Sequence, residues 1–85
     1  MKLDLVYNPA AGNFRERRLA GLVEAFRAFG MDARPLPTRQ EGAQLSGDAD
    51  LVCVHGGDGT LRDTVQALGG QAGTVPLATA PAGTV

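Results

Sequence analysis

The sequence feature that most constrains the fold is an apolar run that leads through a glycine-rich loop into a helical pattern. Residues 49–56 (ADLVCVHG) form the run, which is typical of a central strand in a parallel sheet covered on both faces. After the loop, Leu61, Val65 and Leu68 recur at spacings of four and three, which predicts a helix that ends at Gly69. A strand, a loop and a helix in this order predict one unit of an α/β fold.

The remaining strands are predicted from short apolar segments that are bounded by turn residues. They cover residues 2–8 (KLDLVYN), 31–37 (MDARPLP) and 74–81 (TVPLATAP). Pro35 cannot donate a backbone hydrogen bond, so the segment 31–37 is expected to lie at an edge of the sheet or to end early.

Two further helices are predicted between these strands. The first runs from Asn13 for about four turns and stops at Gly30, and Asn13 and Glu16 have the spacing of a capping box. The second is short and runs from Thr38 to about Leu45, because the TRQE at its start also has capping-box form. The predicted order is β-α-β-α-β-α-β, a three-layer α/β fold with a parallel sheet.

Length and composition limit the class of protein. The 85 residues are predicted to form one small domain, and 44% hydrophobic with 20% charged residues is ordinary for a globular protein. The formal net charge of -1 gives no support for nucleic-acid binding or for attraction to an anionic membrane. The chain has no apolar run of ~18 residues and no signal-peptide pattern, so a cytoplasmic location is expected. The single cysteine, Cys53, is expected to be a buried strand residue.

The loop GGDGT at residues 56–60 has the setting of an anion-binding site. Between a strand and a helix, free backbone N–H groups and the positive end of the helix dipole attract anions. Glycines there would admit a close ligand and positive φ angles. The loop lacks the lysine of a P-loop, and Arg62 stands where a dinucleotide-binding loop has its third glycine. The alternative is a plain tight turn, with Asp58 bonded to nearby N–H groups and Thr60 as the N-cap of the helix.

Asp58 lies between two glycines, where its charge would repel a bare phosphate. A Mg²⁺ ion would separate the carboxylate from the phosphate, because this ion takes one or two carboxylates together with phosphate oxygens and water. The loop is therefore expected to bind a Mg²⁺-nucleotide complex.

The segments that follow the predicted strands are expected to form one site. In a parallel α/β sheet, ligands bind beyond the carboxyl ends of the strands. These segments are residues 8–13, 37–38, 56–63 and 81–85.

Three motifs occur in order along the chain, namely YNPAAG at 7–12, GGDGT at 56–60 and PAGT at 81–84. Together they resemble the diacylglycerol kinase catalytic domain and its relatives, the sphingosine and bacterial lipid kinases. YNPAAG at 7–12 looks like the family's Asn-Pro-x-x-Gly signature, and GGDGT at 56–60 is its glycine motif. PAGT at 81–84 looks like the start of its Pro-x-Gly-Thr-x-Asn-Asp signature. GGDGT is shared more distantly with NAD kinases and 6-phosphofructokinases, whereas the other two motifs favour the lipid-kinase branch.

The resemblance implies that residues 1–85 are the N-terminal part of a nucleotide-binding catalytic domain. ATP would lie in a cleft between this part and a β-rich second domain that residues 1–85 do not contain. Residues implied to surround the nucleotide are Asn8, Gly12, Thr38, Gly57, Asp58, Gly59, Thr60, Leu61, Arg62, Asp63 and Thr84. Among them, Asp58 would take part in the Mg²⁺ network. Structural alternatives remain, with Asn8 as a turn opener, Thr38 as an N-cap and Thr84 as the end of a strand.

The sequence departs from the family pattern directly after GGDGT. Leu61-Arg62-Asp63 stands in place of a small apolar residue followed by Asn-Glu. Asp63 keeps a carboxylate with a shorter reach, and Arg62 is expected to point to solvent. His55 stands where many relatives have a small or apolar residue, and it is given no role.

The function implied by the resemblance is that of a lipid kinase, which transfers the γ-phosphoryl group of ATP to a lipid hydroxyl with Mg²⁺ as cofactor. The acceptor, diacylglycerol or a related lipid alcohol, would bind through the second domain, with at most peripheral membrane contact. No general base is assigned, so residues 1–85 alone are expected to be inactive. The alternatives left open are an NAD kinase-type phosphotransferase and a non-catalytic remnant, either nucleotide-binding or purely structural.

Overall fold

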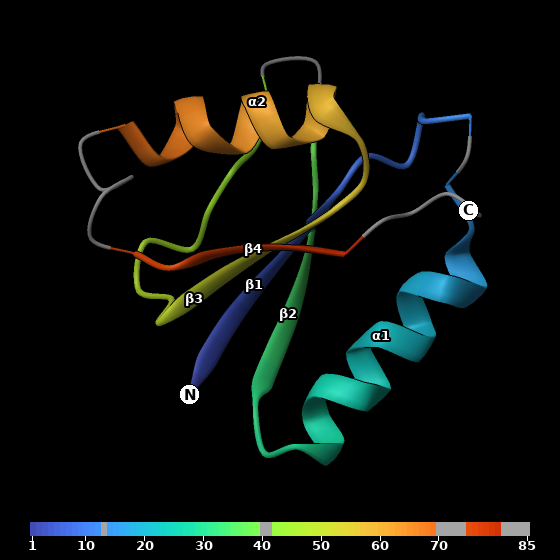
Figure 1. The fold of residues 1–85 in the computed structure, drawn as a ribbon, viewed down its shortest axis with the longest axis vertical. Helices are drawn as coiled ribbons and strands as arrows, with labels where there is room; N and C mark the ends of the chain where they lie inside the picture. The colour runs from blue at the N-terminus through green and yellow to red at the C-terminus, as the bar shows by residue number, and fades with distance from the viewer. Residues whose placement is uncertain (13, 40–41, 70–74, 81–85) are drawn as a thin grey trace.

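The structure is a computed structural model that describes residues 1–12, 14–39, 42–69 and 75–80. These residues form a parallel sheet with a helix on each face (Figure 1). The strands are β1 (Lys2–Tyr7), β2 (Asp32–Pro37), β3 (Leu51–His55) and β4 (Leu77–Ala80), and the helices are α1 (Glu16–Ala28) and α2 (Asp58–Leu68).

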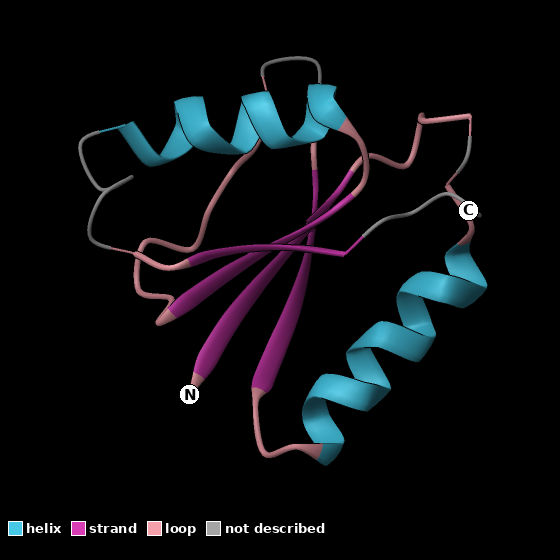
Figure 2. Ribbon diagram, viewed as in Figure 1, coloured by secondary structure: helices cyan, strands magenta, loops and turns pink. Residues whose placement is uncertain are grey.

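The strands lie in the order β2-β1-β3-β4, and each neighbouring pair is parallel. The helices α1 and α2 cover opposite faces of this sheet (Figure 2). The predicted three-layer α/β arrangement is therefore confirmed, as is the edge position of the proline-containing strand β2. The final strand is confirmed at Leu77–Ala80, whereas residue 74, where its predicted start lay, is outside the described residues.

Two apolar clusters hold the layers together, one on each face of the sheet. Successive strand residues point to opposite faces, so Leu5 packs toward α1 whereas its neighbour Val6 packs toward α2. Burying a side chain of this size contributes about 1.5–3 kcal/mol. Cys53 belongs to the cluster under α1, and burial raises the pKa of its thiol, in agreement with a structural position.

The end of α1 is where the sequence predicts it, whereas the predicted start at Asn13 is wrong, because the helix begins at Glu16 and residues 14 and 15 are not helical. Gly30 adopts a positive φ of 83° and donates its N–H to the carbonyl of Arg27 at 3.0 Å. The N–H of Met31 donates to the carbonyl of Phe26 at 3.1 Å, which completes a Schellman motif. The predicted stop at Gly30 is therefore confirmed. At the other end the N-cap is Arg15, and the predicted cap Asn13 is not among the described residues.

The short helix predicted from Thr38 to Leu45 is wrong for the residues that the structure describes there. The backbones of Arg39 and Gly42 instead form an antiparallel bridge, with N–O distances of 2.9 Å in both directions. Gly42 has a φ of 111°, which a helix interior does not allow. The chain then crosses the face of the sheet that α2 covers, where Leu45 packs against the apolar cluster.

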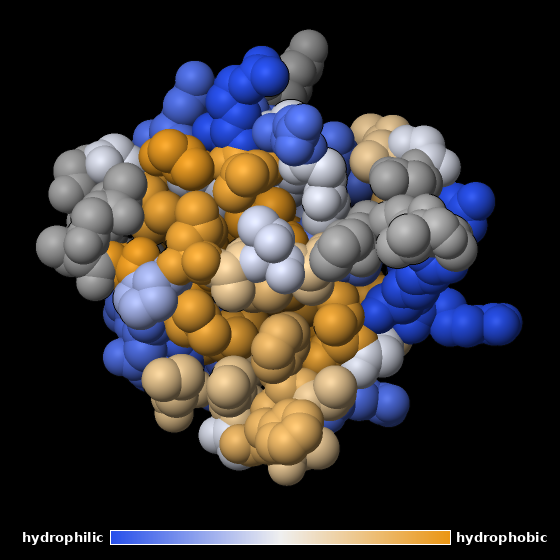
Figure 3. Space-filling model, in the orientation of Figure 1, coloured by the Kyte–Doolittle hydropathy of each residue, from blue (hydrophilic) through white to orange (hydrophobic). Residues whose placement is uncertain are grey.

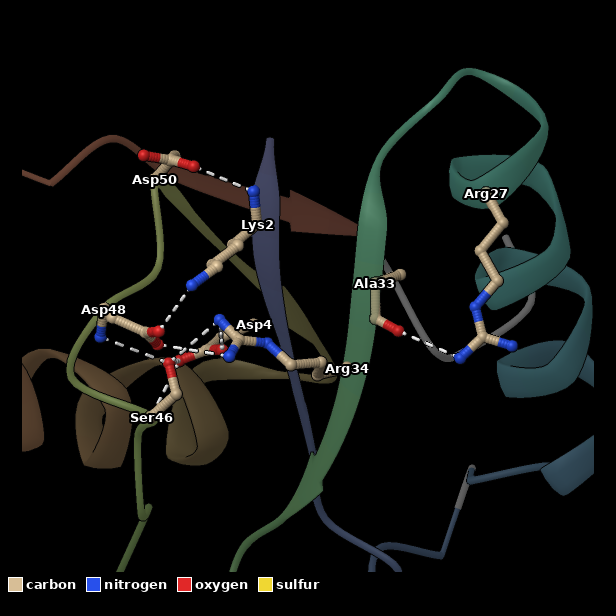
Figure 4. A network of polar contacts seen from close by, with 8 residues as sticks. All are labelled: Lys2, Asp4, Arg27, Ala33, Arg34, Ser46, Asp48 and Asp50. Atoms are coloured by element: carbon tan, nitrogen blue, oxygen red, sulfur yellow. Dashed lines mark hydrogen bonds and ion pairs between the residues drawn. The ribbon is translucent and has the colours of Figure 1, made fainter.

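A polar network fastens this crossing segment to the amino ends of β1 and β2 (Figure 4). Both the backbone N–H and the hydroxyl of Ser46 donate to Oδ2 of Asp4, at 2.9 and 2.8 Å. Arg34 donates to Asp48 and to Ser46, each at 3.1 Å, and Lys2 pairs with Asp48 at 2.9 Å. The segment is thus held by contacts with distant residues and not by a local helix.

The two edges of the sheet differ in character. The outer strand β2 contains Pro35 and Pro37, which cannot donate to a further strand. The other outer strand, β4, has the sequence LATA and is largely exposed. In the view of Figure 3, where β4 crosses in front of the other strands, apolar side chains gather around it. The β4 edge is therefore the one without proline or charge.

Candidate functional site

A groove of about 350 Å³ lies where the carboxyl ends of β1 and β2 meet α2 at Asp63. Its lining residues among those described are Asn8, Pro9, Ala10, Thr38, Arg39 and Asp63. This volume is within the range of about 300–1,000 Å³ that is usual for small-molecule sites. The expectation that the segments after β1, β2 and β3 share one edge is confirmed, and it brings Asn8, Thr38 and Asp63 together.

The first wall of the groove is the turn after β1, which Asn8 shapes. Oδ1 of Asn8 accepts the backbone N–H of Ala10 at 2.9 Å, and the Asn8 carbonyl accepts that of Ala11 at 3.2 Å. The rings of Tyr7 and Phe14 stack at 5.3 Å and join the two ends of the turn. Gly12 lies further along the same turn, is exposed, and is not part of the groove lining.

The second wall is formed by Thr38 and Arg39 at the end of β2. The backbone N–H of Thr38 donates to the carbonyl of Tyr7 at 2.7 Å, which extends the pairing of β2 with β1 by one residue. Thr38 is buried and does not cap a helix, so the N-cap alternative for this residue is wrong. Arg39 follows directly and is exposed.

The glycine loop between β3 and α2 has a conformation that corrects the sequence-based expectation. Gly56, Gly57 and Gly59 all lack the positive φ that was expected of them. Gly57 is the N-cap of α2, so the helix begins at Asp58 and Thr60 is not its cap. A Cβ atom at Gly57 or Gly59 would meet no atom within 4 Å, so the backbone there is open to a ligand. Gly56 is different, because its Cβ would lie 2.9 Å from Oγ1 of Thr60.

Asp58 is exposed in the first turn of α2, at the positive end of the helix dipole. Its carboxylate forms no hydrogen bond or ion pair with the residues that the structure describes, so Asp58 does not bond the loop in the way that the plain-turn alternative requires.

In the first turns of α2, some side chains are buried and others lie at the surface. Thr60 and Thr64 are buried, and the Thr64 hydroxyl donates to the Thr60 carbonyl at 2.8 Å. Leu61 is half-buried. Arg62 is exposed and does not line the groove, as expected for a solvated side chain. Asp63 is half-buried and does line the groove. Among the α2 residues predicted to contact a ligand, Asp63 is thus the one that shares a groove with Asn8 and Thr38.

Two further residues lie at this edge, namely His55, which was assigned no role from the sequence, and Arg39, which was not among the predicted site residues. His55 is 2% exposed at the end of β3, and its Nδ1 lies 3.1 Å from the carbonyl oxygen of Ala80 on β4. Arg39 could have been noticed because it follows Thr38 directly in the sequence. Thr84 and the PAGT motif at 81–84 lie outside the described residues.

The described part of the chain holds no helix that is long and apolar enough to cross a membrane.

Comparison with known families agrees with the geometry of the site. The family model described as "Diacylglycerol kinase catalytic domain" matches residues 2–85. A search of curated proteins gave no match. The family match covers almost the entire chain, including all three motifs and the elements that build the groove. The chain therefore belongs to the diacylglycerol kinase catalytic domain family, a family of phosphotransferases of the kinase type.

Proposed function

We propose that this chain forms the nucleotide-binding part of a lipid kinase, which transfers the γ-phosphoryl group of ATP to the hydroxyl of diacylglycerol or a related lipid. The observation that carries the proposal is the groove at the carboxyl edge of the sheet, where Asn8, Thr38 and Asp63 meet from separate segments. A groove in this position of a parallel α/β fold is the usual place for a nucleotide.

The phosphates would lie near the start of α2. Gly57 and Gly59 expose their backbone, and the first N–H groups of a helix are donors without a partner inside the helix. The positive end of the helix dipole adds to their attraction for an anion. This arrangement uses backbone donors in place of the lysine that a P-loop supplies.

The Asp58 carboxylate fits a metal that arrives with the nucleotide. Asp58 is exposed in the first turn of α2, whereas Asp63 lies five positions further along the helix, about 7.5 Å away along its axis and on a different side. Mg²⁺ commonly takes one or two carboxylates together with phosphate oxygens and water, so Asp58 would hold it together with the nucleotide. When bound, the ion would neutralise part of the phosphate charge.

The transfer also needs an acceptor site and a group that accepts the proton of the lipid hydroxyl. We assign neither to residues 1–85, and we place both on the β-rich second domain of the family. The chain of residues 1–85 is therefore expected to bind Mg²⁺-ATP without phosphorylating a lipid. An assay with labelled ATP and a panel of lipid alcohols would contradict this expectation if it showed turnover.

The proposal is tested by calorimetry with Mg²⁺-ATP on the wild type, Asp58→Ala and Asp32→Ala. Asp32 is a matched control because it is also exposed but lies at the amino end of β2, away from the groove. We expect Asp58→Ala to weaken binding in the presence of Mg²⁺ and Asp32→Ala to bind as the wild type does. Absence of binding to all three proteins would favour a purely structural remnant.

A further inference from the structure

We infer that Arg39 is a phosphate-binding residue of the groove, an assignment that rests on the nucleotide-binding function proposed above. Arg39 lines the groove together with Asn8, Thr38 and Asp63. It is the one positively charged residue among the described residues that do so.

The backbone of Arg39 is held firmly at the mouth of the groove. Its N–H donates to the carbonyl of Gly42, and the Gly42 N–H donates back, both at 2.9 Å. The residue before it, Thr38, is tied to Tyr7 of β1 by a backbone hydrogen bond of 2.7 Å. Gly42 can close this turn because it tolerates a φ of 111°. These backbone hydrogen bonds therefore fix the backbone position from which the Arg39 side chain extends.

The guanidinium of Arg39 is available to a ligand. It forms no hydrogen bond or ion pair with any residue that the structure describes. Several other arginines already have partners in the protein, namely Arg15 with Gly12 and Phe14, Arg27 with Ala33, and Arg34 with Asp4, Ser46 and Asp48. The planar guanidinium presents paired donors that match two phosphate oxygens, so an unpaired one in a groove suits a polyphosphate.

The charges of the groove also favour this assignment. Asp63 contributes a negative charge to the lining, and Asp58 contributes another nearby on α2. A triphosphate would be repelled by both unless cations compensate. Arg39 supplies a fixed positive charge for phosphate oxygens, while the Asp58 carboxylate suits the metal ion. Arg62 lies on α2 outside the groove lining, so it does not supply this positive charge to the groove.

The test is calorimetric titration of the chain with two probes, Mg²⁺-ATP and inorganic tripolyphosphate. The variants are Arg39→Ala, Arg39→Lys and the matched control Arg17→Ala, which removes the same charge from an exposed arginine on α1 outside the groove lining. We expect Arg39→Ala to weaken the binding of both probes about tenfold, as for loss of a charge-assisted hydrogen bond. The affinity of Arg39→Lys should lie between those of the wild type and Arg39→Ala, because lysine keeps the charge but loses the paired donors. Arg17→Ala should stay within about twofold of the wild type, as for a surface charge outside the site.

The salt dependence of binding and the thermal stability of the variants distinguish an effect on binding from an effect on folding. Raising the salt from about 50 mM to about 500 mM should weaken binding more in the wild type than in Arg39→Ala, because the variant has one charge contact fewer to screen. Thermal melting of the two proteins should coincide, since Arg39 is exposed and its turn is closed by backbone bonds.

The outcomes distinguish this inference from the proposed function. If Arg39→Ala binds Mg²⁺-ATP as tightly as the wild type, or if Arg17→Ala loses as much affinity as Arg39→Ala, the assignment to Arg39 fails while nucleotide binding stands. If tripolyphosphate binding depends on Arg39 but ATP does not bind, the phosphate role stands and the nucleotide proposal fails. If the wild type binds neither probe, both are wrong.

Discussion

The guanidinium Nη2 of Arg34 lies 3.2 Å from Oδ1 of Asp4, a residue whose side chain is 1% exposed. The two residues are direct partners in the register of β1 and β2. The other carboxylate oxygen of Asp4 accepts two hydrogen bonds from Ser46 (Figure 4). The buried charge on β1 is therefore compensated from two sides, by the neighbouring strand and by the segment that crosses the sheet.

Removal of the Asp4 carboxylate is expected to destabilise the protein. Asp4→Ala would leave Arg34 without its buried partner and the backbone N–H of Ser46 without an acceptor. We expect the free energy of unfolding to fall by about 2–4 kcal/mol. This is less than the usual loss for a broken, fully buried ion pair, because the Arg34 side chain is 30% exposed. Urea unfolding measures this change.

Two further variants show whether the effect comes from the uncompensated charge. Asp32→Ala removes an exposed carboxylate from the same end of the sheet and should change stability by less than about 0.5 kcal/mol. Replacing both Asp4 and Arg34 with leucine should cost less than Asp4→Ala, because no charge is then left without its partner. Equal stability of Asp4→Ala and the wild type would contradict the importance of the pair.

The Asp4 network also explains why the described residues between Thr38 and Leu45 do not form the helix that the sequence predicted there. The pattern TRQE has the spacing of a capping box, and such local signals are all that a short window of sequence contains. The structure is decided instead by Gly42 at positive φ and by bonds from Ser46 to a residue 42 positions away. The long helices and apolar strands were predictable because their period carries the information along the chain.

Acid is expected to weaken the surface part of the network. Hydrogen bonds from Lys2, then Ser46, then Arg34 hold the pKa of Asp48 well below its usual value of 3.8. A lowered pKa contributes stability that is present above the unfolded value and is lost as the pH falls below it. The loss assigned to Asp48 should therefore begin below about pH 4.

The measurement is the melting temperature between about pH 2 and pH 7 for the wild type and Asp48→Asn. Other carboxylates remain in the variant, so its stability will also fall in acid. Its fall should nevertheless be shallower than that of the wild type, and high salt should narrow the difference. The hydrogen bond to Asp48 raises the pKa of Lys2 above its usual value of 10.5. The stability that Lys2 contributes through this bond is therefore fully present below pH 10.5 and declines at higher pH. Parallel curves for the two proteins would rule out a contribution from Asp48.

The glycines of the loop are expected to differ in their tolerance of alanine. At Gly56 the added Cβ would lie 2.9 Å from Oγ1 and 3.1 Å from Cβ of the buried Thr60, so α2 must shift. We expect Gly56→Ala to lower the free energy of unfolding by about 1–3 kcal/mol, as overpacking does. Gly57→Ala is the control, since a Cβ there meets nothing within 4 Å and φ is −100°. Urea unfolding that ranks the two variants equally would contradict this account of the loop.

The candidate site, like the helices and strands, was partly predictable from the sequence. Asn8, Thr38 and Asp63 could be expected together because parallel topology brings the carboxyl ends of strands to one edge. Arg39 could not, because its position depends on a turn that replaces the predicted helix. Nor could His55 be assigned a partner, since the register that sets it beside Ala80 is a property of the assembled sheet.

The bond between His55 and Ala80 is expected to hold β4 to the strand that precedes the glycine loop. Nδ1 lies 3.1 Å from a carbonyl oxygen, which can only accept, so the neutral imidazole must carry its proton on Nδ1. Nitrogen-15 NMR of the ring should show this tautomer. Asparagine places an amide nitrogen close to the position of Nδ1, so His55→Asn should retain more stability than His55→Leu. For His55→Leu we expect a loss of about 1–3 kcal/mol in urea unfolding, because the partly buried Ala80 carbonyl loses its side-chain donor. A leucine variant as stable as the asparagine variant would mean that packing, and not the hydrogen bond, is what His55 contributes.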